Sequence, residues 1–272
     1  MADDLKTVIA ADGVAPSLLK ALEDWDWAAP ALCALAAESE SFPLEGHVFA
    51  SPLPRSETLP PNFLSDRFLG PADDIQAADE AWGIDFEAEV AVVTDDVPMG
   101  ISPEAAAGCI KLVMLVNDVS LRNLVPNELR KNFGFLHGKP PSFFSPVAVT
   151  PEALGDAWDG AKLHGQVIVT HNGERFGQPD SGQDMYFDFP FLIARAVKTR
   201  PLVADTIVGS GTVSNLNPYA DSCCLAERRT IESGAPKTPF MAFGDRVQIE
   251  MLDGAGNSIF GVIDQKVVRY GD

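Results

Sequence analysis

The sequence contains no apolar run that approaches the ~18 residues a membrane-spanning helix needs. Its N-terminus carries acids where a signal peptide carries Lys or Arg, and no apolar stretch follows. A cytoplasmic location without a membrane partner is therefore expected. Apolar residues make up 46% and charged residues 22% of the 272 residues, as in ordinary globular proteins. That length suffices to bury a core without disulfides or a structural metal.

Basic residues are also scarce. The chain has 20 Lys and Arg against 39 Asp and Glu, a net charge of −19. Residues 1–110 hold 21 of the acids and four of the bases, whereas residues 111–272 are nearly neutral. Phosphate contacts need a basic stripe, so nucleic acid is disfavoured as a partner. Most acids are interpreted as solvated surface. A small anionic substrate must meet its cations in the second half of the chain, or meet a metal.

Motifs for nucleotides and soft metals are missing as well. Neither GxGxxG after a strand nor GxxxxGK[ST] occurs, so nothing supports a nucleotide-phosphate site. The four cysteines form no CxxC and no Cys/His metal spacing. Reduced thiols fit a reducing compartment.

The first part of the chain predicts helices. Leucines recur at helical spacing after Ser17, and a second helix is predicted over residues 27–38. The stretch SPLPRSETLPPNF (51–63) excludes a central strand or a long helix, because proline lacks the N–H donor that both require. We therefore expect a small helical segment over residues 1–60 and a catalytic domain over residues 61–272.

From about residue 84 the pattern favours strands. Two apolar runs predict buried strands, and Asn172-Gly173 and Asp253-Gly254 predict the turns of two hairpins. Helices are expected only near 103–110 and 189–198. Antiparallel hairpins with occasional helices predict an α+β, mainly β fold rather than a Rossmann sheet.

Three carboxylates stand out in this β region. Glu87 and Glu89 open an otherwise apolar strand, and alternation places them on the same face. Asp118 ends a second apolar strand abruptly. Together they offer three hard oxygen ligands, which suits Mg²⁺ or Mn²⁺. The alternatives are an exposed strand face for the glutamates and an Asx turn for Asp118.

Two further segments offer polar groups. Lys139 stands between a glycine and two prolines, so it could present an ammonium group to a carboxylate or a developing oxyanion. Gly211 and Thr212 lie in VGSGTV, where backbone N–H groups can approach a ligand and the hydroxyl can bind a carboxylate. An ordinary loop lysine and a plain turn are the alternatives.

In their order and spacing, these segments resemble the fumarylacetoacetate hydrolase superfamily, most closely its bacterial fumarylacetoacetase-like group. The resemblance runs from about residue 68 to residue 268. The segments that carry it are GIDFEAEVAVV, LVNDVSLRN, GKPPSFFSPVAV, DMYFDFPFLIA, IVGSGTVS and FGDRVQIEMLDGAGNSIFG.

The resemblance implies a mixed β-roll/sandwich fold, usually a homodimer, that holds one divalent ion in a cleft. Glu87, Glu89 and Asp118 match the family's metal ligands, with Mg²⁺ as the expected cofactor and Mn²⁺ or Ca²⁺ as alternatives. The resemblance also implies that Arg122 and Lys139 face the substrate, with Lys139 catalytic, and that Thr212, with Gly211 beside it, contacts a substrate carboxylate.

The chain departs from the family pattern in the region before the paired glutamates. Hydrolytic members resembling it carry a His there that helps to activate water, and the larger ones add an Asp ligand. Here that region is short, the chain starts late, and the nearest stand-ins are His47, Asp66 and Glu57. Glu227 is a candidate acid for water activation, with a surface glutamate as the alternative.

The resemblance implies a metal-dependent enzyme of aromatic catabolism that hydrolyses C–C bonds in small anionic dioxo acids such as fumarylacetoacetate or an acylpyruvate. A 1,3-dicarbonyl would chelate the metal, which would stabilise the enolate that leaves. The missing His favours a first alternative, a decarboxylase of the oxaloacetate type or a dioxo-acid tautomerase or isomerase. A second alternative is a non-catalytic binding protein that has lost its base.

Overall fold

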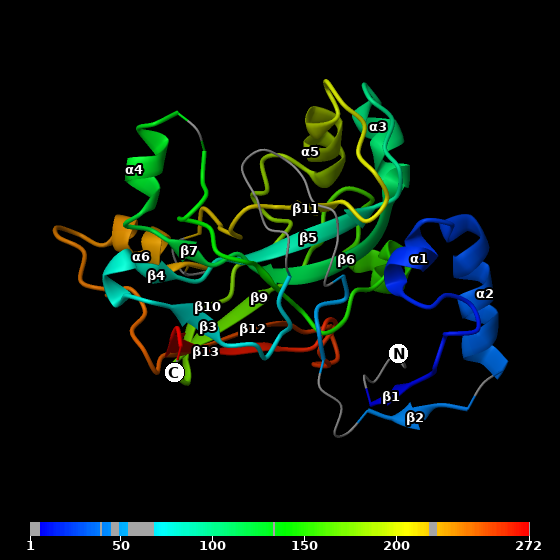
Figure 1. The fold of residues 1–272 in the computed structure, drawn as a ribbon, viewed down its shortest axis with the longest axis horizontal. Helices are drawn as coiled ribbons and strands as arrows, with labels where there is room; N and C mark the ends of the chain where they lie inside the picture. Colours follow the sequence, from blue (N-terminus) through cyan, green and yellow to red (C-terminus); the bar gives the residue numbers. More distant parts are fainter. Residues whose placement is uncertain are drawn as a thin grey trace.

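The structure is a computed structural model. It describes residues 6–38, 40–44, 49–53, 68–132, 134–217 and 222–271. It confirms the predicted α+β, mainly β class (Figure 1). The strands are β1 (Thr7–Val8), β2 (Phe42–Pro43), β3 (Ile75–Ala77), β4 (Ile84–Asp85), β5 (Ala88–Thr94), β6 (Ile110–Asn117), β7 (Ser120–Leu121), β8 (Phe143–Phe144), β9 (Val167–His171), β10 (Glu174–Gly177), β11 (Ile207–Gly209), β12 (Arg246–Met251) and β13 (Ile263–Arg269). The α-helices are α1 (Leu18–Leu22), α2 (Trp25–Glu38), α3 (Pro103–Ala106), α4 (Val125–Leu129), α5 (Phe189–Ala196) and α6 (Leu225–Ile231).

Most described strands belong to two sheets. One has the order β11-β5-β6-β8, and its neighbours are all antiparallel. The other has the order β10-β9-β12-β13-β3, in which only β3 runs parallel to its neighbour. Short pairs β1-β2 and β4-β7 lie outside these sheets. The pairing of β5 with β6 is the longest, so it forms a stiff base for residues at its ends.

Apolar side chains of β5 and β6 serve two separate cores, one on each face. Val90 and Val92 join the larger core, which also takes side chains from the five-stranded sheet. Ala91 and Val93 point the other way and pack with Leu22 of α1 in the second core. Figure 1 shows α1 beside the beginning of β6. Helix α1 and Trp25, the first residue of α2, therefore pack against one face of the four-stranded sheet.

The local predictions can be compared with these elements. The hairpin at Asn172-Gly173 is confirmed, and both turn residues have positive φ angles, as a two-residue hairpin turn of this kind needs. The second hairpin is confirmed for β12 and β13, although their pairing ends at Ile249 opposite Ile263 and a longer loop connects them. Within that loop the Asp253 carboxylate accepts N–H groups from Ala255 and Asn257, both at 2.8 Å.

The two N-terminal helices are also confirmed. The Ser17 hydroxyl caps α1, and α2 begins at Trp25, two residues earlier than predicted. The helix expected near 103–110 is shorter, because a 3₁₀ turn over Ala107–Cys109 leads directly into β6. The boundary expected at residue 60 lies outside the described residues and stays a prediction. No helix in the described ranges has the length and apolar character to cross a bilayer.

Candidate active site

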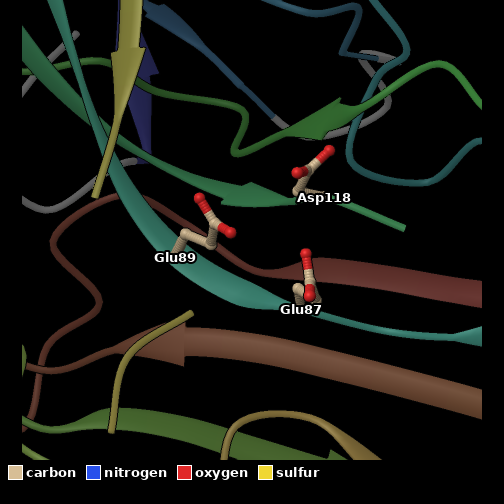
Figure 2. A group of neighbouring side chains, drawn as sticks. All are labelled: Glu87, Glu89 and Asp118. Atoms are coloured by element: carbon tan, nitrogen blue, oxygen red, sulfur yellow. The ribbon is translucent and has the colours of Figure 1, made fainter. Parts of the chain in front are cut away.

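Three carboxylates meet where β5 begins and β6 ends. Glu87 directly precedes β5, Glu89 is the second residue of β5, and Asp118 directly follows β6. The antiparallel register pairs Ala88 with Asn117, and the Asp118 N–H donates to the Glu87 carbonyl at 3.0 Å. One ligand oxygen from each of the three carboxylates lies within 4.8 Å of the others. Figure 2 shows the three side chains gathered around a common space. The structure thus brings together the three residues singled out from the sequence.

All three side chains are buried, with exposed fractions of 7% for Glu87, 6% for Glu89 and 8% for Asp118. Burying a carboxylate is costly unless it meets an opposite charge or a metal. An exposed strand face is therefore wrong as an explanation of the glutamate pair.

Lys139 supplies part of the required positive charge. Its Nζ donates to Glu87 Oε2 at 2.6 Å and to Asp118 Oδ2 at 2.7 Å, and it lies 3.3 Å from the Asp118 carbonyl oxygen. The lysine is itself mostly buried. It therefore joins two of the three carboxylates and is not an ordinary surface lysine.

Arg122 provides the second cation. Its Nη2 pairs with Glu87 Oε1, and its Nε donates to Asp85 Oδ2 at 2.8 Å. Asp85 is completely buried and also accepts the N–H groups of Leu225 and Ala226, the first residues of α6, at 2.7 and 3.0 Å. Asp85 thus connects the Arg122 guanidinium to α6.

Three residues of this region, Asp85, Ser142 and Gly209, were not predicted from the sequence. Asp85 precedes Glu87 by two positions in the run DFEAE, and that spacing was an available signal. Ser142 donates its hydroxyl to Asp118 Oδ1 at 2.8 Å. A Cβ at Gly209 would stand 2.9 Å from Glu89 Oε2, so glycine leaves room for that carboxylate.

The segment after β11 borders the Glu89 carboxylate. Val213 donates its N–H to the Ala88 carbonyl at 3.0 Å, which places the segment along β5. Gly211 donates its N–H to Glu89 and has a φ of 76°, a conformation that favours glycine. Thr212 follows, half-buried, and its hydroxyl makes no hydrogen bond to any described residue. Contact of Gly211 and Thr212 with a substrate carboxylate stays a prediction.

The charges in this cluster shift the protonation equilibria of its members. Burial raises the pKa of Glu87, but the cations of Lys139 and Arg122 outweigh burial and hold it below its usual range. Burial raises the pKa of Glu89 well above its usual range, and the charges of Asp118 and Glu87 raise it further. Burial lowers the pKa of Lys139, but the carboxylates of Asp118 and Glu87 outweigh that effect and raise it. Glu89 is therefore the carboxylate that the protein's own cations neutralise least.

The charge count is consistent with a divalent metal. Four buried acids, the three clustered carboxylates and Asp85, face two basic side chains, Lys139 and Arg122. If all are ionised, the net charge is −2, which one divalent cation cancels. Carboxylate oxygens are the ligands that Mg²⁺, Mn²⁺ and Ca²⁺ prefer. The residues present therefore fit a hard divalent ion.

Glu227 occupies a different position. It lies in the first turn of α6, where Ser214 donates a hydrogen bond to its Oε1, while its buried Oε2 has no partner among the described residues. No hydrogen bond links Glu227 to the three carboxylates within the described ranges. His47, Glu57 and Asp66 all fall outside those ranges.

Two family profiles match the chain. The sequence profile described as "Fumarylacetoacetate (FAA) hydrolase C-terminal" matches residues 41–268, and the profile described as "Fumarylacetoacetase N-terminal domain 2" matches residues 1–55. No protein of curated function gives a significant sequence match.

Solved structures share the fold at low sequence identity. A probable 2-hydroxyhepta-2,4-diene-1,7-dioate isomerase from Mycobacterium abscessus has 17% identity and a TM-score of 0.70, over 99% of this chain and 94% of that one. Maleylpyruvate hydrolase from Sphingobium sp. SYK-6, solved with manganese (II) ion and pyruvate, has 16% identity and a TM-score of 0.67, over 97% and 95%. A 2-hydroxyhepta-2,4-diene-1,7-dioate isomerase from Mycobacterium marinum has 19% identity and a TM-score of 0.58, over 86% and 83%. At these identities the likeness establishes the fold and leaves the reaction open.

Proposed function

Because the chain belongs to the fumarylacetoacetate hydrolase family, we propose that it is a divalent-metal-dependent enzyme that hydrolyses a C–C bond in a small dioxo acid of the fumarylacetoacetate or acylpyruvate type. One observation carries the proposal. Three buried carboxylates converge within 4.8 Å of one another, and the two cations that contact them leave negative charge uncompensated.

Glu87, Glu89 and Asp118 would hold the ion, with Mg²⁺, Mn²⁺ or Ca²⁺ as candidates. When bound, such an ion polarises carbonyl oxygens and stabilises negative charge that develops on them. The manganese (II) ion and pyruvate named for the Sphingobium maleylpyruvate hydrolase support this assignment.

The chain's own cations would then select and orient the substrate. Lys139 is held between Glu87 and Asp118, so its ammonium group stays beside the ion site without a large rearrangement. Arg122 and Lys139 would neutralise the substrate carboxylate, which the acidic chain otherwise repels. The N–H groups near Gly211 and the hydroxyl of Thr212 would contact the same carboxylate.

Hydrolysis also requires a base. Water attacks the distal carbonyl carbon, the adjacent C–C bond breaks, and its electron pair goes to the departing enolate, which then takes up a proton. Glu227 is our candidate to accept the proton from water, since its buried Oε2 has no described partner.

A second candidate reaction is decarboxylation or isomerisation of a dioxo acid. Among the described residues, the side chains that contact the three carboxylates are Lys139, Arg122 and Ser142. None of them is a histidine, which favours this second candidate. Losing a positioned general base typically costs ~10²–10⁴-fold in rate. Decarboxylation would suffer less, because water can supply the proton.

The experiment is a substrate panel of acylpyruvates, fumarylacetoacetate and oxaloacetate, assayed with Mg²⁺ or Mn²⁺ and again with EDTA. A higher kcat/KM for acylpyruvates, abolished by EDTA, supports the hydrolase. A higher value for oxaloacetate supports the second candidate. Metal binding without turnover of any substrate would indicate a binding protein. Sedimentation of the same sample tests the homodimer, which we also propose.

A further inference from the structure

Asp118 differs from the two glutamates in how its carboxylate is held. Both of its oxygens are bound from a single short loop: Lys139 Nζ donates to Oδ2 at 2.7 Å and Ser142 Oγ donates to Oδ1 at 2.8 Å. The carboxylate torsion of aspartate is broad and has no strong intrinsic preference. One contact leaves that torsion free to rotate, whereas two contacts on different oxygens define the carboxylate plane.

The loop that carries these two donors is fixed at both ends. At its start, Leu121 donates its N–H to the Gly138 carbonyl at 2.8 Å, and the Glu128 carboxylate accepts the Gly138 N–H at 3.0 Å. At its end, Leu69 donates its N–H to the Ser142 carbonyl at 3.0 Å. Two consecutive prolines between the donors restrict the remaining backbone. The hydroxyl of Ser142 is therefore delivered by a preorganised backbone.

We propose that Ser142 is a positioning residue for the divalent ion: its hydroxyl fixes the Asp118 carboxylate in the orientation that completes the ligand set with Glu87 and Glu89. The inference rests on the metal site of the proposed function and adds a residue to it. Hydrogen-bond partners of metal ligands restrict the ligand's orientation, and their removal typically weakens metal binding by ~10–100-fold.

A neighbouring serine offers a matched control. Ser120 is completely buried, and its hydroxyl lies 3.4 Å from the backbone carbonyl oxygen of Asp118. It therefore contacts the same residue without touching the carboxylate. Substituting Ser120 removes a hydroxyl near Asp118 and leaves both carboxylate contacts in place.

The test measures Mn²⁺ binding to the full chain by the loss of the electron paramagnetic resonance signal of free Mn²⁺, and Tm for each variant. Ser142→Ala should weaken Mn²⁺ binding by ~10–100-fold. Ser142→Thr, which keeps the hydroxyl, should restore most of the affinity. Ser120→Ala should bind Mn²⁺ as the unaltered chain does.

Equal Mn²⁺ affinity of Ser142→Ala and the unaltered chain would overturn the inference. It would also fall if Ser120→Ala weakened binding as much as Ser142→Ala, or if Ser142→Thr failed to restore it in a folded protein. An unaltered chain that binds no Mn²⁺ would overturn both the metal site and the role of Ser142. An unaltered chain that binds Mn²⁺ but turns over none of the dioxo acids would refute only the reaction.

Discussion

Strand β12 of the five-stranded sheet and strand β5 of the four-stranded sheet place their polar residues in opposite ways. In the five-stranded sheet, buried and partly exposed residues alternate along β12, so that Gln248 and Glu250 keep contact with solvent. In the four-stranded sheet every residue of β5 is buried, Glu89 included. A strand with a core on each face gives a charged side chain no route to water. A glutamate in such a strand therefore needs a partner charge or an ion, which is why it marks a functional site.

The sharpest way to test this contrast is to remove one glutamate from each sheet. Glu89→Ala deletes a proposed ligand and should abolish Mg²⁺- or Mn²⁺-dependent activity while the chain remains folded, because it also removes a buried charge. Glu250→Ala, the same change on β12, should leave activity intact. The measurements are activity with saturating metal and the circular dichroism spectrum. Metal-dependent turnover that survives in Glu89→Ala would contradict the site.

Two lysines near opposite ends of β6, Lys139 and Lys111, give the next largest expected difference. Lys139→Met removes the ammonium group between Glu87 and Asp118, and kcat/KM should fall by on the order of 10²-fold, the loss typical of a positioned donor. KM should rise and kcat fall together, because the charge is used in both the ground and the transition state.

Lys111→Met is the matched control. Lys111 is also partly buried and pairs with Asp95 at 2.9 Å, but it lies at the opposite end of β6. Its kinetic constants should not change. If Lys139→Met also left both constants unchanged, Lys139 would have no part in catalysis.

Two arginine–aspartate pairs test the same contrast through stability. Asp85→Ala leaves Arg122 partly unpaired in a buried setting and removes the acceptor for two N–H groups of α6, so it should reduce the free energy of unfolding by about 3 kcal/mol. The pair Arg246–Asp264 on the other sheet is more exposed, with side-chain exposed fractions of 60% and 27%, so Asp264→Ala should have a smaller effect. Urea denaturation of both variants measures the difference. Similar losses in the two variants would show that burial does not distinguish the pairs.

How much of this was predictable depends on the distance in sequence over which residues interact. Strand alternation places Glu87 and Glu89 on the same face. The antiparallel neighbour β6 ends at Asn117, so Asp118, the next residue, lies close to them. Those relations follow from local rules and from the order of the strands. The ligand set could therefore be proposed from the sequence.

The contacts around that set could not be derived in the same way. Asp85 binds the N-terminus of α6, which lies 140 positions further along the chain, and no local pattern specifies this packing. The family resemblance implied that Arg122 faces a substrate, a role that stays a prediction, and only the three-dimensional structure reveals its ion pairs with Asp85 and Glu87. Ser142 likewise follows two prolines, and its contact with Asp118 depends on how the loop is anchored.

The smallest expected effect concerns a partly buried histidine, His171. His171 ends β9, and its ring lies 5.7 Å from that of Phe86 and 6.2 Å from that of Phe176, measured between centroids. Burial lowers the pKa of His171, and the nearby Asp245 carboxylate only partly opposes that effect. The neutral form is thus favoured in the folded chain. The unfolded chain takes up its proton first, near pH ~6.5, so the free energy of unfolding should fall as the pH decreases from there towards the lower folded-state pKa.

His171→Gln should remove this part of the pH dependence. The variant should therefore lose less free energy of unfolding than the unaltered chain between pH 8 and pH 5. Denaturation with urea from pH 8 to pH 5 measures the slope, and His137→Gln, at an exposed position, serves as the control. If His171→Gln had the same slope as the unaltered chain, His171 would contribute nothing to acid sensitivity, and carboxylates whose pKa the folded chain lowers, such as Glu87, would have to account for it.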